Sequence, residues 1–341
     1  MSVFVEERLA RYGRMTAEAT APYLDGSAPR DHLYDLIADY PARGGKAVRP
    51  ALCLATCVAF GGREEEALPS AVAIELLHNA FLVHDDVEDA SLLRRGQPTL
   101  HARHGIPLAI NAGDALAVIA QAPLRHNRER LSSRLAASIA AEFDVMARRT
   151  LEGQATELGW RRDNTVDLDP QHYLDLVLRK TCWYTTIHPL RVGALIGSWG
   201  TADLDALVRF GFYLGAAFQI ADDLLNLVGD VEPYGKEALG DLYEGKRTLM
   251  VIHLLKASTG AERGAIVDFL GRDRDERSDA DVGHILELMT VHGSLEFARR
   301  FGEGIADAAT ETFVEAFGEV ADSPEVQFVN ELIRWMLDRS S

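Results

Sequence analysis

Apolar residues recur with a helical period along most of this 341-residue chain. The clearest segments are AVAIELLHNAFLVHDDVEDA (71–90) and LDALVRFGFYLGAAFQIADDLLNLV (204–228). In both, apolar side chains return every three or four residues, as on one face of an α-helix. Runs of β-branched residues that alternate strictly with polar ones are nearly absent. The pattern therefore predicts an all-α chain of ten or more helices.

The breaks between the helical segments are short, which bears on the number of domains. None has the composition of a flexible inter-domain linker, and no repeat recurs at a fixed period. Several segments are apolar around much of their circumference, so they must be buried in the centre of the fold or at a subunit interface. We therefore expect residues 1–341 to form a single large helical domain.

Charge and hydropathy limit the classes of function. The formal net charge is −17, whereas nucleic-acid-binding proteins usually carry basic surfaces, so no nucleic-acid partner is expected. The start of the chain lacks the apolar segment of a signal peptide, and no uninterrupted apolar run reaches transmembrane length. Cys53 and Cys57, the first two of three cysteines, have no Cys or His partners at a zinc-ligand spacing and are expected in the core. These features predict a cytoplasmic protein with no membrane insertion.

Two of the predicted helices carry acidic side chains on an otherwise apolar segment. Asp85 and Asp89 are four residues apart and share a helical face, as do Asp222 and Asn226, with Gln219 one turn earlier. A solvated helix end would explain one such pair. Two of them, each interrupting an apolar run, favour a wet cavity or a bound ligand, because polar groups on a core helix are otherwise costly.

The side-chain oxygens of these acidic faces indicate which metal ion they would bind. Oxygen ligands without a nearby cluster of Cys or His suit Mg²⁺. A Mg²⁺ ion held by a few carboxylates usually completes its coordination with water and substrate phosphate. The two faces therefore predict a phosphorylated substrate.

Basic residues that suit phosphate stand in short polar or glycine-marked contexts. Arginine offers phosphate a bidentate fork, and lysine offers a point charge. Each residue alone is better explained as a solvated side chain, and the Gly-Lys pairs lack the full P-loop pattern. Their number suggests more than one phosphate site. The residues are Lys46, Arg49, Arg94, Arg95, Lys180, Lys236 and Lys246.

In combination, these motifs resemble those of trans-isoprenyl diphosphate synthases of the polyprenyl synthetase family. Each motif is weak alone, but together they stand in the family's order and spacing. They are GGKAVRP (44–50), ELLHNAFLVHDDVEDASLLRRGQPTLH (75–101), AINAGDALA (109–117), EGQATEL (152–158), RKT (179–181), FQIADDLLN (218–226) and GKEALGDLYEGKRTL (235–249). The regions before Gly44 and after about residue 255 match only as helices.

The resemblance implies a fold and a reaction. The fold would be an all-α bundle of the isoprenoid synthase type around a deep central cavity, assembled as a homodimer. The reaction would be Mg²⁺-dependent head-to-tail condensation of isopentenyl diphosphate with dimethylallyl, geranyl or farnesyl diphosphate. The allylic C–O bond ionises, and Mg²⁺, Lys and Arg stabilise the diphosphate anion as its charge develops. The double bond of the second substrate then attacks the allyl cation and a proton is lost, so no protein nucleophile is needed.

The resemblance also implies roles for individual residues. The metal ligands would be Asp85, Asp89 and Asp222, holding three Mg²⁺ ions with substrate bound, supported by Asp86, Asp223 and Asp241. The allylic diphosphate would contact Arg94, Lys180, Gln219, Lys236 and Lys246. Isopentenyl diphosphate would bind without metal at Lys46, Arg49, His78 and Arg95. Thr181 and Gln219 would steady the cation with their dipoles.

One departure keeps alternatives open. The second acidic motif of the family usually ends in Asp, and here Asn226 stands there. The segment DDLLNLVGD (222–230) also distantly resembles a metal motif of class I terpene cyclases. A cyclase needs no isopentenyl diphosphate pocket, however, and a non-catalytic partner subunit would be expected to lose an acidic motif. Both alternatives therefore rank below the synthase.

The first acidic helix can also set the length of the product. Phe81 precedes Asp85 by four residues, Ala80 by five and Leu77 by eight, or about 6 to 12 Å along a helix. In short-chain members of the family, bulky side chains four and five residues before the first Asp close the cavity. Because Ala80 leaves half of that plug missing, we expect geranylgeranyl diphosphate, with a farnesyl or longer product as the alternative.

Overall fold

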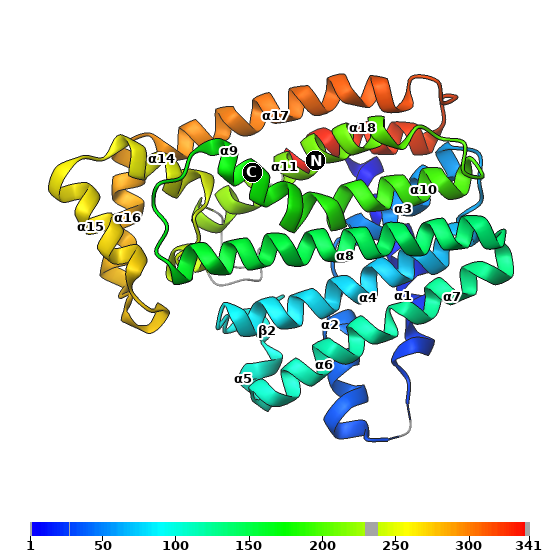
Figure 1. The fold of residues 1–341 in the computed structure, drawn as a ribbon, viewed down its shortest axis with the longest axis horizontal. Coiled ribbons are helices and arrows are strands. Elements are labelled where there is room, and N and C mark those ends of the chain that lie inside the picture. The colour runs from blue at the N-terminus through cyan, green and yellow to red at the C-terminus, as the bar shows by residue number, and fades with distance from the viewer. Residues whose placement is uncertain (1, 27, 229–237, 338–341) are drawn as a thin grey trace.

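The computed structural model describes residues 2–26, 28–228 and 238–337, and most of them lie in helices (Figure 1). The helices are α1 (Val3–Leu24), α2 (Asp35–Ala42), α3 (Val48–Ala59), α4 (Glu64–Glu88), α5 (Leu100–His104), α6 (Ile106–Ile119), α7 (Gln121–Arg130), α8 (Ser133–Arg162), α9 (Pro170–Val177), α10 (His188–Gly197), α11 (Leu204–Val228), α13 (Gly240–Tyr243), α14 (Leu249–Ala257), α15 (Gly260–Gly271), α16 (Asp279–Val291), α17 (Ser294–Phe317) and α18 (Pro324–Leu337). The described chain also contains two π-helical segments, η1 (Arg30–Tyr34) and η2 (Leu178–Ile187), and one 3₁₀ turn, η3 (Arg274–Glu276). The predicted all-α fold class is confirmed.

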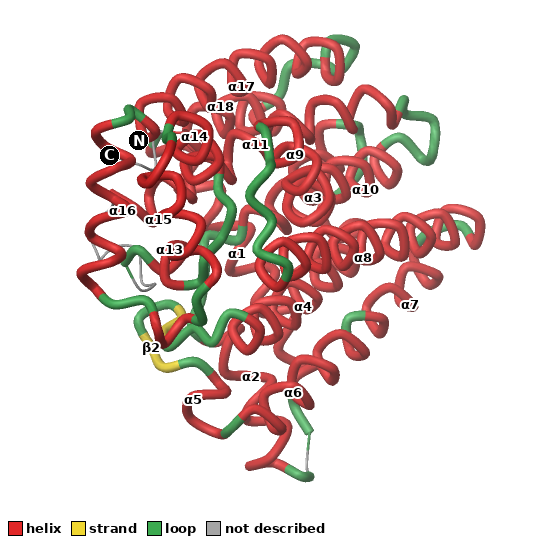
Figure 2. Tube along the Cα trace, turned by 60° about the vertical axis from the view of Figure 1, so that its left-hand side comes forward, coloured by secondary structure: helices red, strands yellow, loops and turns green. Residues whose placement is uncertain are grey.

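The long helices pack side by side as a bundle. Helix α4 lies between α3 and α6, α10 packs along α3, and α11 packs along α17. Helix α8 crosses the face of the bundle in Figure 1 and packs against η2. Within the described residues the strands are confined to one short antiparallel pair, β1 (Leu93–Arg94) and β2 (Gln97–Pro98). Figure 2 shows this pair at the end of the bundle near α13.

Helix α4 brings the first acidic motif to that end of the bundle. Its first turn carries three glutamates, which suit the positive end of the helix dipole, and Glu66 accepts the backbone N–H of Arg63. The helix ends at Glu88, after which Ala90 adopts a left-handed conformation with φ of 51°. Asp85 and Asp89 therefore stand at the negative end of the dipole, which disfavours carboxylates unless cations lie nearby.

A π-helix interrupts the helical column formed by α9 and α10. Segment η2 carries Lys180 and Thr181, and π-helical turns often occur at functional sites. Gly153 of α8 allows close approach, because a Cβ there would lie 2.3 Å from the backbone nitrogen of Lys180. Gly215 of α11 allows a second close approach to η2, because a Cβ there would lie 2.8 Å from the sulfur of Cys182. Small residues thus let α8 and α11 hold η2 between them.

The apolar core forms two adjoining clusters. One gathers the buried faces of α1 to α4, α6, α10 and α18, and the other those of α14 to α16 with parts of α9 and α11. Half-buried Trp183 and Ile305 pack against both. All three cysteines are fully buried and none forms a disulfide; burial was predicted for Cys53 and Cys57. The prediction of a single domain is compatible with this packing and stays a prediction.

Three helical segments of the described chain are long and apolar enough to cross a membrane by length and composition alone. They are Glu64–Glu88, Ile106–Arg130 and Leu204–Val228. The first and last have 67% and 56% of their apolar window buried inside the fold, and both carry an acidic motif. The middle one is only 33% buried. Sequence analysis expected no uninterrupted apolar run of transmembrane length, and it singled out two of these segments as helices without weighing them as membrane spans. The absence of membrane insertion stays a prediction.

Candidate active site

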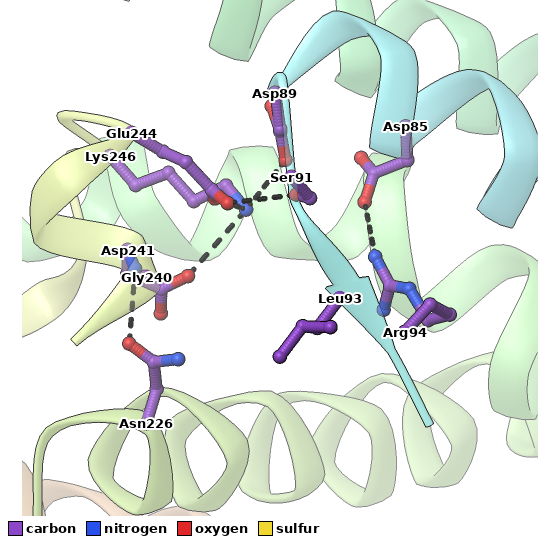
Figure 3. Close-up of a pocket in the computed structure, with 10 residues that line it drawn as sticks. All are labelled: Asp85, Asp89, Ser91, Leu93, Arg94, Asn226, Gly240, Asp241, Glu244 and Lys246. Carbon is purple, nitrogen blue, oxygen red and sulfur yellow. Dashed lines mark hydrogen bonds and ion pairs between the residues drawn. The ribbon is translucent and has the colours of Figure 1, made fainter. Parts of the chain in front are cut away.

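A polar pocket lies where the ends of α4 and α11 face each other (Figure 3). It encloses about 340 Å³, part of it open to solvent. The first acidic motif, the β1 segment, the end of α11 and the turn after α13 all contribute to its wall. The lining residues are Asp85, Asp89, Ser91, Leu93, Arg94, Asn226, Gly240, Asp241, Glu244 and Lys246. The structure therefore brings together segments more than 100 residues apart. Of the predicted metal ligands, Asp85 and Asp89 line the pocket, whereas Asp222 is not among its lining residues.

Cations surround the two carboxylates of the first motif. Asp85 accepts from the Gln154 amide at 3.3 Å and from the Lys180 ammonium at 3.5 Å. Asp89 is almost fully buried, with the Lys246 ammonium and the Arg161 guanidinium each 2.8 Å away. These contacts offset the mutual repulsion of two carboxylates that lie one helical turn apart.

The charges of this cluster favour ionised acids and protonated amines. Burial disfavours the Asp89 carboxylate, but Lys246, Lys180 and Arg161 outweigh it and lower the pKa of Asp89. The pKa of Lys246 rises well above its ordinary value, because Asp89 and Glu244 outweigh the opposing effect of burial. Glu244 differs, since burial raises its pKa to about 7. At neutral pH the pocket thus holds an ionised Asp89 and a firmly charged Lys246, whereas Glu244 exchanges its proton in the neutral range.

Asp86 has a supporting place beneath the pocket. Its side chain is fully buried, accepts from the Tyr40 hydroxyl at 2.5 Å, and receives the Arg94 guanidinium through Nε at 2.9 Å and through Nη2. The same guanidinium lies 3.7 Å from Asp85. Asp86 therefore fixes Arg94 beside the carboxylate predicted to bind metal.

The second motif is held by a chain of polar contacts on α11. The Thr181 hydroxyl of η2 donates to the side-chain oxygen of Gln219 at 2.8 Å, and the side-chain amide of Gln219 donates to Asp223 at 2.6 Å. Asp223 also accepts from the Tyr173 hydroxyl at 2.8 Å, and burial raises its pKa to about 8. Asp222, the predicted ligand, is half-buried next to it. Thr181 and Gln219 are thus hydrogen-bonded to each other, and their role toward the cation stays a prediction.

Asn226 binds the facing turn in addition to lining the pocket. Its side-chain oxygen accepts the backbone N–H of Asp241 at 3.0 Å, and its carbonyl accepts that of Leu239 at 3.0 Å. Figure 3 shows the Asp241 contact. A position that seemed only a weakened metal ligand therefore also anchors the segment that carries Asp241. Lys236, the remaining predicted contact in this region, lies outside the described residues.

The donor set fits a divalent metal ion. The Lys246 ammonium stands 2.8 Å from Asp89, 3.5 Å from Asp241 and 2.6 Å from Glu244. A cation is therefore already stabilised between carboxylates from both sides of the pocket. Among the described residues no three acidic, His or Cys side chains converge closely enough to enclose a metal alone. A metal here would draw further ligands from water and substrate.

The predicted isopentenyl diphosphate residues gather at the start of α3. Arg49 lies 3.2 Å from His78 Nε2, donates to Thr185 at 2.9 Å, and has its guanidinium carbon 4.3 Å from the ring centre of Tyr184. Burial and Arg49 lower the pKa of His78 well below its ordinary value, so the imidazole is neutral and accepts from Arg49.

Lys46 and Arg95 meet at the glycine loop that precedes α3. Arg95 donates to the Tyr40 carbonyl at 3.0 Å, and a Cβ on Gly45 would lie 2.8 Å from its guanidinium. The exposed Lys46 places its ammonium 5.3 Å from the ring centre of Trp335 in α18. Lys46 is thus part of the loop on which Arg95 packs, and a side chain at Gly45 would displace the Arg95 guanidinium.

Sequence reasoning missed several residues of this neighbourhood. Gln154 stood in a recognised motif without a role, and Glu157 of the same motif binds Lys180 at 2.6 Å. Arg161 and Glu244 gave no separate signal, because their importance comes from contact with Asp89 and Lys246. Tyr184 resembled a core aromatic, although its ring touches both Arg49 and the chain-length candidate on α4.

The three chain-length candidates occupy different surroundings on α4. Phe81 is half-buried and meets Tyr184 edge-on at 5.8 Å, and Leu77, one turn earlier, is buried. Ala80 is fully buried. It precedes by one turn His84, whose ring is in close contact with Gly113 of α6, so Ala80 lies on the α6 side. The role of these residues in product length stays a prediction.

Comparison with known proteins identifies the family. The family model named polyprenyl synthetase matches residues 30–289. A geranylgeranyl diphosphate synthase of Sulfolobus acidocaldarius is 36% identical over 73% of this chain and 74% of its own. A short chain isoprenyl diphosphate synthase of Methanothermobacter thermautotrophicus is 34% identical, covering 86% and 87%. A geranylfarnesyl diphosphate synthase of Aeropyrum pernix is 33% identical, covering 87% and 91%.

Solved structures agree with this assignment. A geranylgeranyl pyrophosphate synthetase of Pyrococcus horikoshii superposes with a TM-score of 0.85 at 29% identity, covering 98% of this chain and 99% of its own. A geranylgeranyl pyrophosphate synthase of Corynebacterium glutamicum, complexed with isoprenyl diphosphate and magnesium, gives 0.81 at 26% identity, covering 98% and 97%. The chain therefore belongs to the polyprenyl synthetase family and is a prenyltransferase.

Proposed function

We propose that this protein condenses isopentenyl diphosphate with an allylic diphosphate, head to tail, and releases geranylgeranyl diphosphate. The observation that carries the proposal is the pairing of two different cation-lined places. One is the acidic pocket between α4 and α11, and the other is the arginine–histidine group at the start of α3. An enzyme that joins two diphosphates needs two such places, and relatives named as geranylgeranyl diphosphate synthases support the product.

Asp85 and Asp89 would hold Mg²⁺ in the acidic pocket, with Asp222 of α11 as the third predicted ligand. When bound, Mg²⁺ supplies positive charge that polarises the allylic diphosphate. Lys180 and Arg94, already fixed beside Asp85, add hydrogen bonds to the same anion. Preorganised donors of this kind stabilise a leaving group as its charge grows, without first having to reorganise. The number of ions follows from the family resemblance and belongs to the proposal.

The second substrate would bind near Arg49, where no carboxylate is in contact with the guanidinium among the described residues. Neutral His78 leaves the full charge of Arg49 for the diphosphate of isopentenyl diphosphate, and Lys46 and Arg95 approach from the glycine loop. The Thr181–Gln219 pair supplies oxygen dipoles toward the allyl cation. The departing diphosphate accepts the proton, so no protein base is required.

The arrangement favours a synthase over the two alternatives from sequence. A terpene cyclase has no use for the Arg49–His78 group, and a non-catalytic subunit has no use for two complete cation-lined sites. An exposed apolar strip on α6 supports the homodimer expectation, since Ile106, Ile110 and Val118 are 54%, 43% and 72% exposed. A cytoplasmic location is part of the same proposal.

The test is incubation of the purified protein with labelled isopentenyl diphosphate, Mg²⁺ and each of three primers: dimethylallyl, geranyl and farnesyl diphosphate. The proposal expects geranylgeranyl diphosphate as the main product and no elongation with excess chelator. A cyclic hydrocarbon made from an allylic diphosphate alone would support the cyclase instead. If no primer is elongated while the protein remains folded, the proposal is wrong.

A further inference from the structure

The short hairpin that carries Arg94 and Arg95 contains a strained turn. Strands β1 and β2 pair Arg94 with Gln97, so Arg95 and Gly96 form a two-residue turn. Their φ angles are 54° and 72°, in the left-handed region. Glycine adopts this region freely, whereas a residue with a Cβ does so at a cost. The position of Arg95 therefore depends on contacts that hold the hairpin from outside.

Arg43 of the loop after α2 provides most of those contacts. Its Nη1 donates to the Arg94 carbonyl at 2.9 Å and to the Gln97 carbonyl at 3.4 Å, and its Nη2 donates to the Pro98 carbonyl at 2.8 Å. Its Nε donates to Asp39 at 2.6 Å, and its side chain is 2% exposed. One buried guanidinium thus ties both strands of the hairpin to α2.

The two arginines of the hairpin depend on this support unequally. The Arg94 guanidinium has its own anchor in Asp86, a fully buried carboxylate that also accepts from the Tyr40 hydroxyl. The hydrogen bond of the Arg95 guanidinium within the described residues goes to the Tyr40 carbonyl, and it packs on Gly45. A shift of the turn would therefore move Arg95 more than Arg94.

We propose that Arg43 is a positioning residue for Arg95 and, through it, for the isopentenyl diphosphate pocket. The inference rests on the proposed function, which assigns Arg95 to isopentenyl diphosphate and Arg94 to the allylic substrate. Arg43 itself does not touch either substrate, because its donors are taken up by the hairpin carbonyls and Asp39. Its loss raises the KM for one substrate selectively.

The test compares Arg43→Met and Arg43→Lys with the wild type, measuring kcat and the KM of each substrate while the other is saturating. Arg43→Met should raise the KM for isopentenyl diphosphate about tenfold, as expected when a charge-assisted hydrogen bond is weakened. The KM for the allylic substrate should change less than about twofold. Arg43→Lys keeps the charge but loses the fork, so its effect should be intermediate.

Arg103→Met is the matched control. Arg103 binds the same Asp39 at 3.0 Å but is exposed, and within the described part of the chain it makes no hydrogen bond or ion pair with the hairpin. Both KM values should stay at wild-type level in this variant. Melting temperatures of all variants show whether each protein is folded, and Arg43→Lys decides the matter if Arg43→Met fails to fold.

Variants of Arg95 separate the inference from the proposed function. Arg95→Met should raise the KM for isopentenyl diphosphate, and adding Arg43→Met to it should raise that KM little further, because the two residues act through one contact. An equal rise in both KM values, or a fall in kcat alone, after Arg43 substitution overturns the inference. If Arg95→Met leaves that KM unchanged in an active enzyme, the assignment of the pocket is wrong instead.

Discussion

Replacing Phe81 with Ala should lengthen the product. Phe81 stands one helical turn before Asp85, about 6 Å along α4, and Leu77 stands about 12 Å before it. Removing the Phe81 ring therefore opens about one further turn of the helix face before Leu77 blocks it. With farnesyl diphosphate as primer, we expect the main product to shift from geranylgeranyl to geranylfarnesyl diphosphate or longer.

The substitution should cost stability without unfolding the protein. A fully buried Phe→Ala change costs about 3–5 kcal/mol, and Phe81 is only half-buried, so about 2 kcal/mol is expected. Loss of the edge-on contact with Tyr184 adds about 1 kcal/mol. The sum, about 3 kcal/mol, stays below the free energy of unfolding of roughly 5–15 kcal/mol that is typical of folded domains.

The assay is chromatography of dephosphorylated products made from labelled isopentenyl diphosphate. Phe313→Ala is the matched control, because Phe313 is also half-buried and packs on aromatic rings, but lies on α17. Its product should remain that of the wild type. If Phe81→Ala also leaves the product length unchanged while the enzyme turns over, Phe81 is not the floor of the elongation site.

Three further predictions concern the metal site, the packing of η2 and the response to pH. Asp89→Asn should lower kcat by about 100-fold or more and raise the Mg²⁺ concentration needed for half-maximal rate, whereas Asp163→Asn on the surface should do neither. Gly153→Ala should lower the free energy of unfolding by about 2 kcal/mol or more, because its Cβ would lie 2.3 Å from a backbone nitrogen of η2; Gly159→Ala on the same helix meets nothing within 4 Å and should not destabilise. Burial lowers the pKa of His188 to about 3, below its unfolded value. The contribution of the neutral imidazole to the free energy of unfolding is therefore complete above about pH 6.5 and is lost as the pH falls toward 3. Urea melts of the wild type should show that His188 accounts for about 1.4 kcal/mol of the stability lost between pH 7.5 and 5.5. His188→Leu should lack that part of the loss. An unchanged pH dependence in that variant would contradict the assignment.

The all-α fold and the family could be predicted from sequence because both depend on local spacing. Helical periodicity is a short-range property, and the prediction of many helices with almost no strand was correct. Asp85 and Asp89 share a face of α4 because four residues make about one turn. The motifs then identified the polyprenyl synthetase family, which the family model and the relatives confirm.

The pairing of charges could not be predicted, since it depends on contacts between distant segments. Sequence spacing cannot show that Lys246 would sit between Asp89 and Glu244, or that Asp86 would bind Arg94 rather than face the pocket. Sequence analysis also interpreted Asn226 only as a weaker metal ligand, whereas in the fold its side-chain oxygen holds the turn that carries Asp241.

The sequence by itself thus determined which helices form and which face of each is acidic, because residues one turn apart meet wherever the helix lies. Only the tertiary structure decided that Arg43, next to a recognised motif but outside it, would tie down the hairpin of Arg94 and Arg95. It also decided that Ala80 faces α6 while Phe81 meets Tyr184. Such contacts follow from the packing of helices far apart in the chain, where small differences in rotation about a helix axis select the neighbours of each side chain.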